Sequence, residues 1–167
     1  FPVADCVIVP GKGFDKVLLA CRCRASYVVL QRVPLSKVIR MPVFHVVPFS
    51  DIGVPALLAQ ADREGMRIFQ SAVQSARRCG SAHFESNSVR HRVVRQDGAA
   101  DIELGADAVV WRFDATKMDE LLVLVAALID CGTAGHHYVD DLRSPVETLV
   151  LSVDEYPGFG TTTAGGR

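Results

Sequence analysis

The sequence predicts an α+β fold, in which a three-stranded antiparallel meander is covered by one amphipathic helix and completed by a final strand, with helical segments before it. Three observations support this prediction. Residues 88–114 contain three short β-branched runs separated by Gln-Asp-Gly and Gly-Ala-Asp turns. Residues 116–131 then place apolar side chains at helical spacing, and a strand over residues 149–153 would place Leu149, Leu151 and Val153 on one face.

The first 65 residues show the weakest pattern. Short β-branched runs at residues 5–9, 16–23 and 26–33 predict strands, but prolines interrupt the region and favour edge or irregular strands. We therefore expect residues 1–65 to form a poorly patterned N-terminal extension or a small β/α segment. Because the sequence begins with Phe and residues 66–167 are locally consistent, Met66 is a candidate natural start.

Two helices are predicted before the meander. Residues 50–65 favour a helix that begins near Pro55, since proline suits the first turn. A second helix is expected over residues 66–79, because Gly80 can end it and Arg77 and Arg78 suit its last turn. Its apolar positions form one stripe: Ile68, Phe69, Ala72, Val73 and Ala76.

The meander should bury one face of each strand. Val89, His91 and Val93 alternate with arginines in the first strand, and we expect His91 to be half-buried and hydrogen-bonded. The third strand places Val109, Trp111 and Phe113 on one face. The following strand, around residues 149–153, could pair in either direction, and the sequence does not decide the strand order.

The helix over residues 116–131 is the clearest element. Thr116 and Asp119 resemble a capping box, and Gly132 stands where a left-handed residue commonly ends a helix. We expect residues 66–157 to form a compact α+β domain. The Gly/Thr-rich residues 158–167 predict a disordered tail.

The charges are distributed unevenly along the 167 residues. Residues 1–100 contain 14 Lys and Arg against 7 Asp and Glu, whereas residues 101–167 contain 4 against 12. The two halves can therefore attract each other, or the acidic half can face a charged partner. Five cysteines, an odd number without a C-x-x-C pair, disfavour a disulfide framework or a zinc ribbon and favour reduced thiols in a cytoplasmic protein. We expect no membrane association, because the longest clean apolar run is shorter than a membrane helix.

Residues 135–142, GHHYVDDL, hold the densest set of functional side chains. We expect a solvated loop between a helix and a strand. The alternative is a divalent-metal site formed by His136, His137, Asp140 and Asp141, whose nitrogen and oxygen atoms suit Zn²⁺, Mn²⁺ or Fe²⁺. The tetrapeptide YVDD resembles the Y-x-D-D turn of reverse transcriptases over four residues, without the palm strands and the longer chain of that family.

The favoured function is a non-enzymatic protein-binding or regulatory module without a cofactor. It would bind a basic protein partner through an acidic surface formed by Asp140, Asp141, Asp154 and Glu155. The alternative is a metal-dependent enzyme of the hydrolase class that uses the His/Asp set. We do not expect a nucleic-acid partner, because aromatic residues do not alternate with the basic side chains Arg77, Arg78, Arg90, Arg92 and Arg95. The oligomeric state stays open.

Overall fold

The computed structural model describes residues 5–10, 17–20, 42–50 and 53–155, and this part of the chain is mostly β. One sheet has four strands in the order β3-β4-β11-β9. Within it, β3 and β4 are antiparallel, β4 and β11 are parallel, and β11 and β9 are antiparallel. The four strands are β3 (Phe44–Phe49), β4 (Ala56–Ala61), β9 (Gly135–Val139) and β11 (Thr148–Val153).

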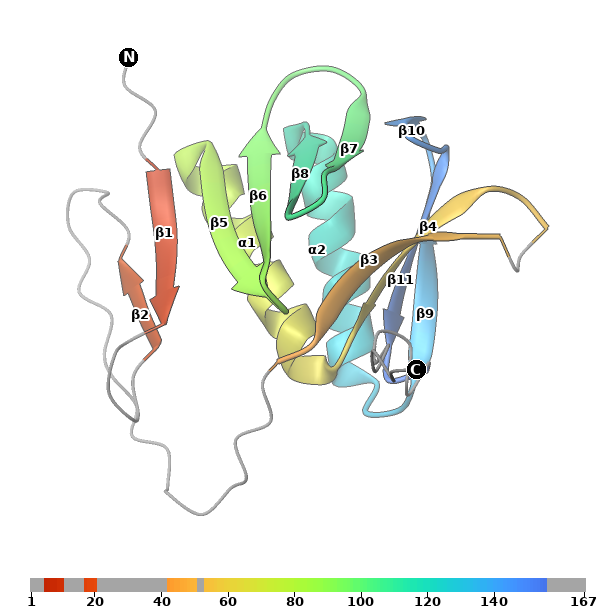
Figure 1. The fold of residues 1–167 in the computed structure, drawn as a ribbon, viewed down its shortest axis with the longest axis horizontal. Helices are drawn as coiled ribbons and strands as arrows, with labels where there is room; N and C mark the ends of the chain where they lie inside the picture. The colour runs from red at the N-terminus through yellow and green to blue at the C-terminus, as the bar shows by residue number, and fades with distance from the viewer. Residues whose placement is uncertain (1–4, 11–16, 21–41, 51–52, 156–167) are drawn as a thin grey trace, which may run out of the picture.

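The second sheet has the order β10-β7-β8-β6-β5-β1-β2. Figure 1 shows two helices, α1 (Arg63–Cys79) and α2 (Ala115–Asp130), behind the two sheets. The helices contact each other; α1 packs on β5 and β6, and α2 packs on β9 and β11. The strands are β1 (Asp5–Pro10), β2 (Val17–Ala20), β5 (Ser81–Ser86), β6 (Val89–Arg95), β7 (Ala100–Leu104), β8 (Ala108–Phe113) and β10 (Leu142–Ser144).

The predicted fold class, a three-stranded meander with one covering helix and a final strand, is wrong. The three strands exist, but β6 pairs in parallel with β8 and not with β7. The Asp-Gly pair at residues 97–98 therefore joins strands that are not neighbours, while β7 forms its antiparallel pair with β8. Turn chemistry favours a hairpin locally, but the tertiary pairing places β8 between the two strands.

The predicted helix near Pro55 is also wrong, because residues 56–61 form β4. All six side chains of β4 are buried, and the strand lies between β3 and β11. A strand buried on both faces shows a continuous apolar run, which periodicity cannot distinguish from a buried helix. The helix begins only at Arg63, after Asp62 accepts a hydrogen bond from the Gly65 N–H group at 2.7 Å.

The other predicted helices are confirmed. The helix expected over residues 66–79 is α1, and Gly80 follows it with a φ of 94°. The helix expected over residues 116–131 is α2, although its N-cap is Asp114, whose carboxylate accepts from the Lys117 N–H group at 2.7 Å. Residues 135–139, expected to lie in a loop, form the strand β9, because β11 supplies a partner for every one of them. The predicted strand at residues 26–33 and the predicted tail at 158–167 lie outside the described residues.

The fold contains two similar ββαββ units in sequence. The first is β3-β4-α1-β5-β6, and the second is β7-β8-α2-β9-β11 with the short β10 inserted. The first unit places β3 and β4 in the four-stranded sheet and β5 and β6 in the other sheet. The second unit does the reverse: β9 and β11 lie in the four-stranded sheet, and β7 and β8 lie in the other. The strand orders β3-β4-β11-β9 and β7-β8-β6-β5 therefore correspond. The parallel contacts β4–β11 and β6–β8 join the two units, and each sheet is incomplete without both.

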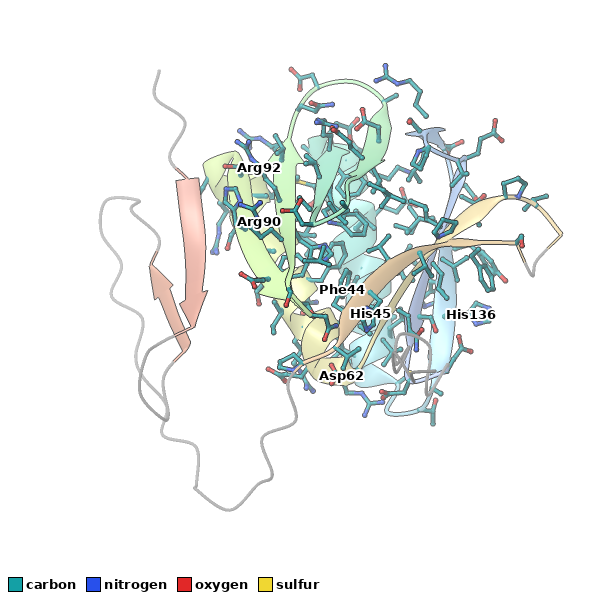
Figure 2. All side chains as sticks on the ribbon, in the orientation of Figure 1. Phe44, His45, Asp62, Arg90, Arg92 and His136 are labelled. Atoms are coloured by element: carbon teal, nitrogen blue, oxygen red, sulfur yellow. The ribbon has the colours of Figure 1, made fainter. Side chains whose placement is uncertain are left out.

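Phe44 of β3 lies where the two sheets meet (Figure 2). Its N–H group donates to the Ser86 hydroxyl at 3.0 Å, and its ring stacks on Phe69 with the centroids 5.0 Å apart. Trp111, fully buried on β8, also packs against this ring. Phe44 and the β4 residues Leu57, Ala59 and Ala61, all upstream of Met66, are therefore part of the same core as the helices and β8.

Candidate functional site

An acidic hollow lies where β9 ends and the chain returns to β11. Asp141 adopts a left-handed conformation with a φ of 63°, which turns the chain into β10. The Leu142 N–H group donates to the Glu147 carbonyl at 3.1 Å and closes the loop. The hollow, called the acidic hollow below, is lined by Asp140, Asp141, Leu142, Arg143, Glu147 and Thr148.

Three carboxylates of the acidic hollow have no ion-pair partner among the described residues: those of Asp140, Asp141 and Glu147. The Asp140 carboxylate accepts a hydrogen bond from the Thr148 hydroxyl at 2.9 Å, and the Asp140 backbone carbonyl accepts one from the Lys117 ammonium at 3.0 Å. Arg143 is the one basic residue in the lining, and its guanidinium bonds to the buried Asp101 carboxylate on β7 at 3.2 Å. The hollow therefore keeps an excess of negative charge that is available to a partner.

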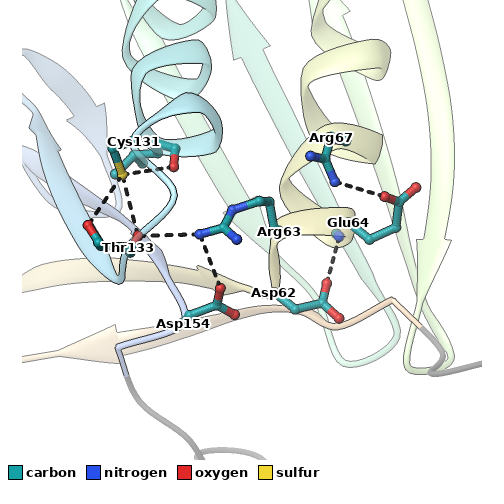
Figure 3. Close-up of polar contacts among 9 residues, drawn as sticks. Asp62, Arg63, Glu64, Arg67, Cys131, Thr133 and Asp154 are labelled. Atoms are coloured by element: carbon teal, nitrogen blue, oxygen red, sulfur yellow. Dashed lines mark hydrogen bonds and ion pairs between the residues drawn. The ribbon is translucent and has the colours of Figure 1, made fainter.

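The other two acidic residues of the predicted surface lie at the opposite end of the β9–β11 pair. Five paired positions, roughly 20 Å of strand, separate Asp140 from Asp154. Asp154 forms an ion pair with Arg63 at 3.7 Å, and Arg63 also donates to the Thr133 carbonyl at 3.5 Å (Figure 3). This end of the sheet is thus partly neutralised by the chain itself.

Glu155 is also engaged within the chain. Its carboxylate lies 2.9 Å from Nδ1 of His136 and accepts from the buried Ser152 hydroxyl at 2.8 Å. The structure therefore brings together two predicted site residues that were assigned to different sites, His136 and Glu155. A carboxylate that holds one imidazole nitrogen fixes the ring and leaves Nε2 directed away from that bond.

The four residues of the alternative metal site do not converge. His136 pairs with Ser152 and His137 pairs with Leu151, so their side chains lie on opposite faces of the sheet. Asp140 and Asp141 follow at the far end of β9. In the part of the chain that the structure describes, no group of three or more His, Cys, Asp or Glu side chains could hold a metal ion.

The basic side chains lie on another part of the molecule. Arg90 and Arg92 are on β6, away from His136 on β9 (Figure 2). Arg90 forms an exposed ion pair with Asp107 at 3.1 Å, and Arg77 bonds to Asp119 at 2.8 Å. Part of the positive charge of the first half is therefore balanced by carboxylates of the second half.

Sequence reasoning missed Glu147. It lies six residues beyond Asp141, and β10 turns the chain so that both line one hollow. The only signal in the sequence was the high density of acidic residues after position 100. No helix in the described ranges has the length and apolar character that crossing a membrane requires.

No protein-family model matches this sequence, and comparison with curated proteins finds no significant match. Among solved structures, the chain is similar to part of a crystal structure of Drosophila Suppressor of Fused, with a TM-score of 0.43 and 12% sequence identity. The similarity covers 75% of this chain and 29% of that chain, so this chain spans less than a third of the other protein's length. A likeness at this level carries no conclusion about function.

Proposed function

We propose that this chain is a non-enzymatic protein-binding module that recognises a basic partner through the acidic hollow. The observation that carries the proposal is the set of three unpaired carboxylates, Asp140, Asp141 and Glu147, around one concave surface. Paired surface charges contribute little to binding because they are already satisfied, whereas unpaired carboxylates attract lysine and arginine side chains over about one Debye length. Asp154 and Glu155 lie at the other end of β9, where Arg63 and His136 already bind them, so the proposed surface does not include them.

Contacts between the loop of the hollow and the rest of the fold support this role. Arg143 is tied to Asp101 on β7, and Leu142, which is buried, anchors the loop to the core. These contacts fix the backbone that carries the carboxylates, which limits the backbone entropy lost on binding.

The test uses short polylysine as a defined basic probe, with binding measured by calorimetry at low and moderate salt. The triple variant Asp140→Asn, Asp141→Asn, Glu147→Gln should lower the affinity by about tenfold and flatten the salt dependence. The matched control removes the same charge elsewhere, through Glu85→Gln, Asp97→Asn and Asp130→Asn, all of which are exposed. Equal losses in the two triple variants would show that net charge alone, and not the hollow, attracts the probe.

A further inference from the structure

Strand β9 forms one edge of the four-stranded sheet. It pairs with β11 over Gly135–Val139, and no described strand pairs with its other side (Figure 1). The outward backbone N–H and C=O groups of an edge strand can therefore pair with an added strand. Proteins usually protect such edges with proline, lysine, bulges or very short strands.

The other edge strands with described side chains are protected. Strand β3 contains Pro48, and its first N–H group, on Phe44, bonds to the Ser86 hydroxyl. Strand β10 has three residues and an irregular register with β7. Strand β9 has none of these features: its five residues pair regularly with β11, and it contains neither proline nor a lysine or arginine.

We propose that β9 accepts an extended segment of the partner as an additional antiparallel strand. This inference rests on the proposed function, because the acidic hollow lies directly beyond Val139 at the end of β9. An antiparallel segment would place its N-terminal end at the hollow, where lysine or arginine meets the carboxylates. Tyr138, 46% exposed, and His136 lie on the outer face and can contact alternate side chains of the added strand.

A second copy of this chain fits the edge poorly. Two β9 strands paired antiparallel would place the acidic hollow of each copy opposite Gly135 of the other, beside Asp154 and Glu155. Both ends of such a pair would bring carboxylates together, which costs free energy. The charge arrangement therefore favours a different, basic partner.

The probe is the acetylated and amidated peptide Lys-Lys-Thr-Val-Thr-Val-Thr, titrated to millimolar concentration into the isotopically labelled full chain. Two analogues carry N-methyl groups on alternate residues, one on odd and one on even positions, with unchanged charge. Because alternate N–H groups of a strand point to opposite edges, only one analogue should lose affinity, by about tenfold. The amide signals of Gly135–Val139 should shift on binding of the unmodified peptide, and those of β3 should not.

Equal binding by both analogues, or amide shifts at β3 and not at β9, would overturn strand addition. So would the absence of any binding by the unmodified peptide. If both analogues bind equally but the triple variant of the acidic hollow still loses affinity, the proposed function stands and strand addition fails. If one analogue loses affinity but the triple variant binds as the wild type does, the edge accepts strands without the acidic hollow.

Discussion

Acidification should weaken this fold through His91, which is 1% exposed on β6. Its ring stacks on Phe84 with centroids 4.5 Å apart, and its Nδ1 atom accepts a hydrogen bond from Trp111 Nε1 at 3.3 Å. Burial, and secondly the nearby charge of His45, lower the pKa of His91 from 6.5 to about 4. Because Nδ1 accepts from Trp111, the neutral ring carries its proton on Nε2, which has no hydrogen-bond partner among the described residues. A second proton would have to bind Nδ1, where it would face the Trp111 N–H group and not an acceptor.

The lowered pKa of His91 means that stability falls as the pH falls. The folded state holds His91 neutral, while the unfolded chain binds a proton near pH 6.5, so the unfolded state binds more protons between pH 6.5 and 4. The stability that the neutral His91 ring contributes to the folded state is fully present above pH 6.5 and is lost as the pH falls toward 4. This pKa shift contributes about 3 kcal/mol in total to the free energy of unfolding, of which about 2 kcal/mol is lost by pH 5.

The assay is urea unfolding at pH 7.5, 6.0 and 5.0, followed by circular dichroism, for the wild type and His91→Gln. The glutamine carbonyl can still accept from Trp111, but the side chain does not titrate. The variant should be less stable at pH 7.5 because it loses the stack on Phe84. The difference in free energy of unfolding between the wild type and the variant should be smaller by about 2 kcal/mol at pH 5. A constant gap across the three pH values would refute the reasoning, since it would show that His91 does not titrate differently in the folded state.

Three further predictions concern stability. Gly65→Ala should destabilise the protein by about 1–3 kcal/mol in urea unfolding, because the added Cβ would meet the Val43 carbonyl oxygen; an unchanged midpoint would contradict this. Asp101→Asn should lower the thermal midpoint by several degrees, since it weakens the ion pair with Arg112 and the tie to β10, and a midpoint within one degree would show that the network is dispensable. Deleting residues 1–65 removes β3 and β4, so the remaining chain should show no cooperative unfolding, whereas a cooperative transition would show that the second part folds alone.

The sequence predicted part of the candidate site. Asp140 and Asp141 were predicted as partner-binding residues from their position and from the charge of the second half, and the structure places them in the acidic hollow. Asp154 and Glu155 belong to the same run of acidic sequence but lie at the far end of the sheet. Glu147 joins the hollow only because β10 folds the chain back, a feature that three residues of sequence do not reveal.

The sequence by itself determined the elements whose signals are local. Helix α2 and most of α1 follow from apolar periodicity and terminal glycines, and the alternation of β6 and β8 follows from one buried face each. Asp62 and Asp114 each follow a six-residue, largely apolar strand and cap the next helix. This repeated order of strand, aspartate and helix is the feature of the two units that the sequence itself shows.

Only the tertiary structure decided which strands are neighbours. Strand β4 became a strand because β3 and β11 satisfy its backbone on both sides, which overrides the helical preference of its Ala and Leu residues. The two units are joined by two parallel strand pairs. Strands β4 and β11 are about 90 residues apart in the sequence, and β6 and β8 are about 18 residues apart. No local pattern encodes such pairings, because their stability comes from burying two sheet faces against the helices at once.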